Sequence, residues 1–158
     1  MKNTFKRSGA ALISLVLLLV LAVSAGAASS QNVGVKFWKE RSDKESMANS
    51  GIDPDRTATL TRQANGTYTL TLPVMQVSKM GVTGSLSGLT IGDVTYDGTL
   101  TGDFNKATAV LTIKNLPASV LTGSDVNKSV LVTCNIQMDL QVLGEINTSA
   151  RMCIWNQK

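Results

Sequence analysis

Few residue types in this sequence can carry out chemistry, and most of them contain sulfur. The 158-residue chain has two cysteines, six methionines and no histidine. The lack of histidine excludes nucleophilic catalysis that needs a histidine base, and it excludes zinc sites built from histidine. Two cysteines are too few for a structural zinc site or an iron–sulfur cluster. We therefore expect a protein that is not an enzyme.

The two cysteines, Cys134 and Cys153, are predicted to form a disulfide. A disulfide is the default for two cysteines in an exported chain, and residues 1–27 have the pattern of an export signal. A two-residue turn at Leu143-Gly144 places the cysteines opposite each other, but it pairs apolar positions with polar ones. A shift of one residue aligns both apolar faces and sends the cysteines to opposite faces. Two buried thiols are therefore the alternative.

Residues 1–27 have the three parts of a secretory signal peptide. Met1–Gly9 is short and basic, Ala10–Val23 is apolar apart from one serine, and Ala25 and Ala27 fit the small residues before a cleavage site. We expect cleavage after Ala27. An uncleaved membrane anchor is the alternative, although the apolar stretch is short for a membrane span. The mature chain is expected to be secreted and not to insert into a membrane.

The charge of the chain gives no reason to expect a nucleic-acid partner. Three of the 15 basic residues lie in the signal segment, whereas all 11 acidic residues follow it. The remaining 12 basic residues nearly balance the acidic ones, so the mature chain lacks the positive charge that binds phosphate backbones. Aromatic residues make up 4% of the chain, which is too few for a base-stacking surface.

The segments that must position any site alternate threonine with apolar residues, which is typical of β-strands. Asn65-Gly66 is a strong hairpin signal, and Lys39–Pro54 has room for one short helix. About eight strands predict an all-β fold, namely an immunoglobulin-like, eight-stranded antiparallel β-sandwich with one short helix after the first strand. A closed barrel is the alternative. We expect strands over Val33–Trp38, Thr57–Gln63, Thr67–Val74, Gly81–Ile91, Val94–Gly102, Ala107–Lys114, Val130–Val142 and Ile146–Trp155.

The segment from Val35 to Leu72 resembles the start of NEAT (near-iron transporter) domains, which are haem-handling modules of Gram-positive surface proteins. Those relatives begin with a strand, a short helix that contains Ser-Met, a proline-bearing link and a hairpin of the Asn/Asp-Gly-x-Tyr type. The resemblance implies that residues 28–158 form one NEAT-like β-sandwich domain at the surface of a Gram-positive cell or outside it. The matching positions are Trp38-Lys39, Ser42-Asp43, Ser46-Met47, Pro54, Gly66 and Tyr68.

The resemblance also implies where haem would bind. NEAT domains hold haem between the short helix and the last hairpin, which places Ser46 near a propionate and Met47 over the haem. The haem-binding relatives carry Tyr-x-x-x-Tyr on the last strand, but the matching stretch, Gly144–Ala150, has no tyrosine. Methionine sulfur is an axial ligand of haem iron in other proteins and could replace it. The candidate ligands are Met47 on the helix and Met138 or Met152 on the hairpin, and Met47 is the first choice for the metal.

The missing tyrosines leave a second hypothesis open. The domain would then keep its fold without haem and act as a protein-binding or adhesion module, as many NEAT domains are thought to do when they recruit host proteins. The fold alone does not decide between the two, because one fold supports many functions. The expected partner is therefore either haem or a surface or host protein.

Overall fold

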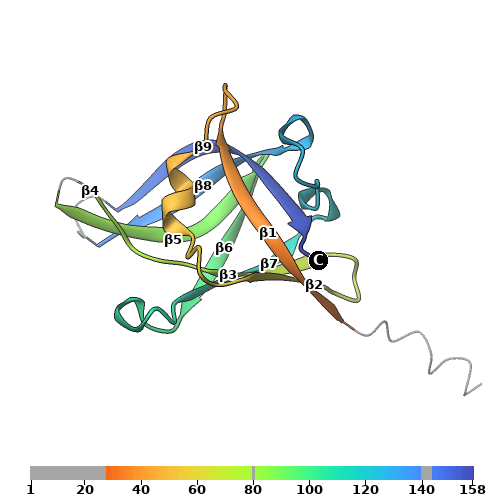
Figure 1. The fold of residues 1–158 in the computed structure, drawn as a ribbon, viewed down its shortest axis with the longest axis horizontal. Coiled ribbons are helices and arrows are strands. Elements are labelled where there is room, and N and C mark those ends of the chain that lie inside the picture. The colour runs from red at the N-terminus through yellow and green to blue at the C-terminus, as the bar shows by residue number, and fades with distance from the viewer. Residues whose placement is uncertain (1–27, 80, 140–143) are drawn as a thin grey trace, which may run out of the picture.

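A computed structural model describes residues 28–79, 81–139 and 144–158, and most of the regular structure in these ranges is β-strand (Figure 1). The all-β prediction is confirmed. The predicted signal peptide, residues 1–27, lies outside the described residues. In the described ranges no helix has the length and apolar character needed to cross a bilayer. The strands are β1 Ser29–Lys39, β2 Ala58–Arg62, β3 Tyr68–Pro73, β4 Val77–Lys79, β5 Val82–Ile91, β6 Val94–Thr101, β7 Val110–Leu116, β8 Val130–Met138 and β9 Glu145–Asn156.

Eight of the strands form one antiparallel sheet that closes on itself. Their order is β5-β6-β7-β3-β2-β1-β9-β8, and β8 pairs again with β5, while β4 adds to β5 outside this ring. The immunoglobulin-like sandwich is not confirmed, because β1 and β5 each have partners on both sides instead of ending two separate sheets. Strand number and alternation are the same in both architectures, so the sequence pattern could not separate them.

The short helix predicted after the first strand is only a 3-10 turn of five residues, η1 (Met47–Gly51). The Ser46 hydroxyl caps it by accepting a hydrogen bond of 3.3 Å from the Ala48 amide. Asn, Ser and Gly within the turn disfavour a longer helix, because Asn and Ser compete for backbone hydrogen bonds and Gly loses much chain entropy. Three further 3-10 turns are η2 (Phe104–Lys106), η3 (Ala118–Val120) and η4 (Val126–Lys128).

The inward-facing side chains of the closed sheet form one hydrophobic core. The alternation predicted for the strand around residues 67–74 is confirmed, since its apolar residues are buried and its threonines are half-buried on the other face. Each apolar side chain removed from water stabilises the fold by roughly 1.5–3 kcal/mol. The largest fully buried side chains are Phe37, Leu60, Leu70, Leu72, Leu89, Leu111, Ile113, Leu116, Met152, Ile154, Val33 and Val74.

The pairing of β8 with β9 separates the two cysteines, and the predicted disulfide is wrong. Cys134 lies opposite Thr148, and both Cys134 and Cys153 are buried free thiols. Cys153 is five residues further along β9, about 17 Å at the rise of a β-strand, which is far more than a disulfide spans. Cys134 belongs to the core, whereas the Cys153 sulfur lies 3.6 Å from the Asp125 carbonyl oxygen under η4. The observed register places the apolar residues of β8 opposite the apolar residues of β9. We infer that burying these side chains stabilises the fold more than a disulfide would.

Candidate functional site

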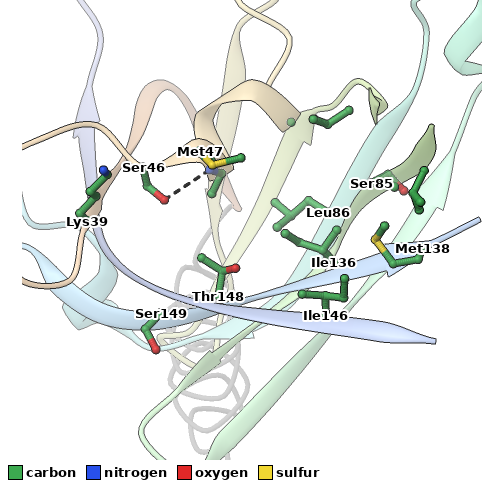
Figure 2. Close-up of a pocket in the computed structure, with 15 residues that line it drawn as sticks. Lys39, Ser46, Met47, Ser85, Leu86, Ile136, Met138, Ile146, Thr148 and Ser149 are labelled. Carbon is green, nitrogen blue, oxygen red and sulfur yellow. Dashed lines mark hydrogen bonds between the residues drawn. The ribbon is translucent and has the colours of Figure 1, made fainter. Parts of the chain in front are cut away.

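A cavity of about 370 Å³ opens between η1 and the ends of β5, β8 and β9 (Figure 2). Its volume is within the range of small-molecule binding sites, about 300–1,000 Å³. Leu86, Ile136 and Ile146 form its apolar floor, and Met47 and Ala48 lie on the side of η1. We call residues 45–51 the lip of the cavity. The walls therefore suit a ligand with a large apolar surface.

The cavity exists because the closed sheet stops before its longest strands do. The pairing of β1 with β9 ends where Lys39 lies opposite Ala150. Residues 145–149 of β9 continue to pair with β8, but no other described strand pairs with them. The inward-facing side chains of this extension are thus outside the closed ring. The lip covers them from one side only, which leaves an opening to solvent.

A β-bulge in β5 lies at the boundary between the core and the cavity. Leu86 is opposite Ile136 and Gly88 is opposite Asn135, so Ser87 is an extra residue in β5. The Ser87 hydroxyl donates a hydrogen bond of 3.0 Å to the Asn135 carbonyl oxygen. Because the extra residue shifts the alternation, Leu86 and Leu89 both face inward: Leu86 is buried in the core and also lines the cavity, and Leu89 is fully buried in the core. Bulges are common next to binding sites, where they redirect side chains.

Asn49 attaches the lip to β1. Its side-chain oxygen accepts a hydrogen bond of 2.8 Å from the Phe37 amide, and its side-chain nitrogen donates one of 2.7 Å to the Phe37 carbonyl oxygen. The Ser46 amide donates a further bond of 3.0 Å to the same carbonyl. Asn49 was not predicted as a site residue, because an asparagine in a polar segment is typical of any turn. Only its position beside the Ser-Met pair could have drawn attention to it.

Arg151 holds the loop before the lip. Its guanidinium donates hydrogen bonds of 3.1 Å to the Lys39 carbonyl and 3.0 Å to the Ser42 carbonyl, and it lies 2.7 Å from an Asp43 carboxylate oxygen. These contacts turn the chain away from β9 at the end of β1. Lys39 also lines the cavity and is the only charged side chain on its wall among the described residues. The rim therefore carries one positive charge beside an apolar interior.

Three of the four predicted ligand-contacting residues meet at the cavity. Ser46 and Met47 lie on the lip, and Met138 lies on the opposite wall, as Figure 2 shows. Met152 does not reach the cavity, because it pairs with Phe37 inside the closed ring and is fully buried in the core. The sequence pattern correctly placed Met152 on the apolar face of β9, but at this position the closed sheet buries that face in the core.

The donor atoms of the cavity wall are neutral apart from the Lys39 ammonium group. They are the thioethers of Met47 and Met138 and several hydroxyls, including that of Ser46. Burial raises the pKa of the Cys134 thiol to about 12, so this residue offers no thiolate for a metal. Within the described part of the chain, no group of three His, Cys, Asp or Glu residues is arranged to hold a metal ion. The thioethers are thus the softest donors in the cavity.

The fold resembles that of a NEAT domain. The NEAT5 domain of IsdX2, a B. anthracis hemophore, in complex with heme, superposes with a TM-score of 0.53, covering 83% of this chain and 98% of that domain at 10% sequence identity. A mutant of the same domain in complex with heme gives the same values. At such low identity the likeness concerns the fold alone. No family model and no curated protein matches the sequence.

Proposed function

We propose that this protein is an extracellular haem-binding module that holds haem in the cavity between the lip and the β8–β9 hairpin. The observation that carries the proposal is the apolar cavity of about 370 Å³ in that place. It lies in a fold like that of a hemophore domain whose structure contains heme. The position agrees with the one that the sequence resemblance implied.

The residues of the cavity fit the chemistry of haem. Its apolar floor suits the flat face of a porphyrin, and the exposed Lys39 ammonium and the buried Ser46 hydroxyl on the cavity wall suit acidic propionate groups. Met47 and Met138 would hold the haem iron through their thioether sulfurs, which bind haem iron in other proteins. Haem, when bound, would supply the iron centre. The protein binds, orients and shields the porphyrin, which is the work of a carrier and not of an enzyme.

The proposed setting follows from the same function. A module that takes up haem must meet it outside the cell, and residues 1–27 match an export signal. We propose that residues 28–158 are the exported domain and that it works at or beyond the surface of a Gram-positive bacterium.

Titration with hemin tests the proposal. The protein should give a saturable, shifted Soret band with one haem per chain. Thr148→Phe places an aromatic ring in the cavity and should abolish the band. Thr71→Phe is the matched control, because Thr71 is half-buried on the outer face of β3, away from the cavity. It should bind hemin as the unmodified protein does.

A broad absorbance that rises without saturation, with hemin and with dithionite-reduced haem alike, would contradict the haem proposal, as would equal binding by both variants. The haem-independent alternative would then be the better hypothesis. In that case, capture experiments with surface and host proteins should depend on the exposed apolar side chains at the cavity mouth, where Met47 is 59% and Ile146 is 43% exposed.

A further inference from the structure

The soft donors of the cavity come from two different walls. Met47 lies on the lip, and Met138 lies on β8 beside β5, so a flat ligand between the lip and the floor would have one thioether on each side. Tyr68 and Tyr96 do not line the cavity. The chain contains no histidine, so no imidazole can compete with the thioethers.

The Met138 thioether is positioned by a missing side chain. Gly84 on β5 lies opposite Met138, and a Cβ atom added to Gly84 would be only 2.8 Å from the Met138 sulfur. The sulfur therefore lies directly over the backbone of β5, in space that any other residue would fill. This close approach keeps the thioether at the cavity wall.

A neutral thioether binds ferrous and ferric haem iron with different affinities. Soft donors favour the softer, less positively charged metal ion, and methionine ligation raises the reduction potential of haem. An anionic oxygen ligand would instead favour the ferric form, but none is present on the described cavity wall. The only charge on the wall, that of Lys39, is also unfavourable to extra positive charge on the iron.

We propose, on the basis of the haem site argued above, that this cavity selects ferrous over ferric haem and that the thioethers of Met47 and Met138 cause the preference. The preference concerns the oxidation state of the ligand and requires no reaction by the protein. Each tenfold difference in affinity between the two states corresponds to a rise of about 59 mV in the reduction potential of bound haem.

The test compares four ligands: ferric haem, haem reduced with dithionite under anaerobic conditions, zinc protoporphyrin and metal-free protoporphyrin. We expect ferrous haem to bind at least about tenfold more tightly than ferric haem. The variant with Met47→Leu and Met138→Leu keeps the side-chain volume and should lose this difference while it still binds metal-free protoporphyrin. Met75→Leu is the control, because Met75 is 42% exposed and lies outside the cavity wall. This control variant should still bind ferrous haem more tightly than ferric haem.

A spectroelectrochemical titration supplies the second readout. The reduction potential of haem bound to the unmodified protein should exceed that of haem bound to the double variant. Equal affinity for both oxidation states, tighter binding of ferric haem, or a preference that survives in the double variant would overturn the inference. Failure of all four porphyrins to bind would instead overturn the proposed function, so the two failures are distinguishable.

Discussion

The two ends of the closed sheet differ in what covers their inward-facing side chains. On β8, Val132 and Cys134 are buried in the core, whereas Ile136 and Met138, further along the same face, line the cavity. On β9 the same change occurs between Ala150, which is fully buried, and the residues before it. One continuous apolar face can therefore line both the core and the cavity. The core ends and the cavity begins where the pairing of β1 with β9 stops.

The largest expected difference between the two ends is in stability. Met152→Ala removes a fully buried side chain at the covered end and should lower the free energy of unfolding by about 2–5 kcal/mol. Ile146→Ala at the open end should lower it much less, because Ile146 is 43% exposed. Urea unfolding measures both. Equal losses would show that the cavity floor is part of the core.

The Cys134 thiol tests how completely the covered end excludes water. Burial raises its pKa from 9.0 to about 12, so between these values the unfolded chain loses a proton that the folded protein keeps. The contribution to stability is complete below pH 9.0 and should be lost by roughly 1 kcal/mol per pH unit as the pH rises from 9.0 towards 12. Unfolding at about pH 8 and about pH 10 should show this slope, and Cys134→Ala should reduce it. An unchanged slope would contradict the assignment.

The same cysteines allow a direct check of the β8–β9 register. Both thiols should be unreactive in the folded protein and should react after unfolding without a reductant, because they are buried and unpaired. Thiols that appear only after reduction would restore the disulfide and require a different register.

Asn49→Ala should weaken the open end while the covered end stays intact. The change removes both side-chain hydrogen bonds to Phe37, which should cost about 1–3 kcal/mol and loosen the lip. We expect hemin affinity to fall by about tenfold or more. Asn49→Asp keeps the acceptor and loses the donor, so it should have an intermediate effect. Unchanged affinity in both variants would mean that the lip does not contribute to binding.

A small effect is expected at the rim. Asp43→Asn removes the charge that pairs with Arg151, but the Asp43 side chain is 69% exposed, so the loss should be at most about 1 kcal/mol. The loop should stay in place, because Arg151 also binds two backbone carbonyls. Raised salt should reduce the difference between the variant and the unmodified protein. A large loss of hemin binding would indicate that the loop, rather than Asn49, positions the lip.

Local patterns in the sequence predicted the strands well, because alternation of apolar and polar residues depends only on near neighbours. The hairpin at Asn65-Gly66 and the eight long strands are present, and only the short β4 was missed. The closure of the sheet could not be predicted, since it depends on pairing between β1 and β9, which are more than a hundred residues apart. The disulfide prediction rested on the expected export of the chain, and it failed because the register of β8 with β9 places Cys134 opposite Thr148 and away from Cys153.

The candidate site was predicted in part. Ser46, Met47 and Met138 meet at the cavity, because the Ser-Met pair and the last hairpin mark its two sides. Met152 shows the limit of this reasoning: its strand position is equivalent to that of Met138 in pattern, but the ring covers it. Asn49 shows the opposite limit, since its role depends on a contact with Phe37 across twelve residues.

The bulge at Ser87 has a consequence for how this protein can diverge. The extra residue reverses which positions of β5 face inward, so the alternation of apolar and polar residues before Ser87 does not continue after it. Leu86 and Leu89 therefore both face inward although they are three residues apart: Leu86 lies opposite Ile136 and Leu89 opposite Cys134, and both leucines belong to the hydrophobic core. A substitution at Leu86 that reshaped the cavity would thus also change the packing of the core.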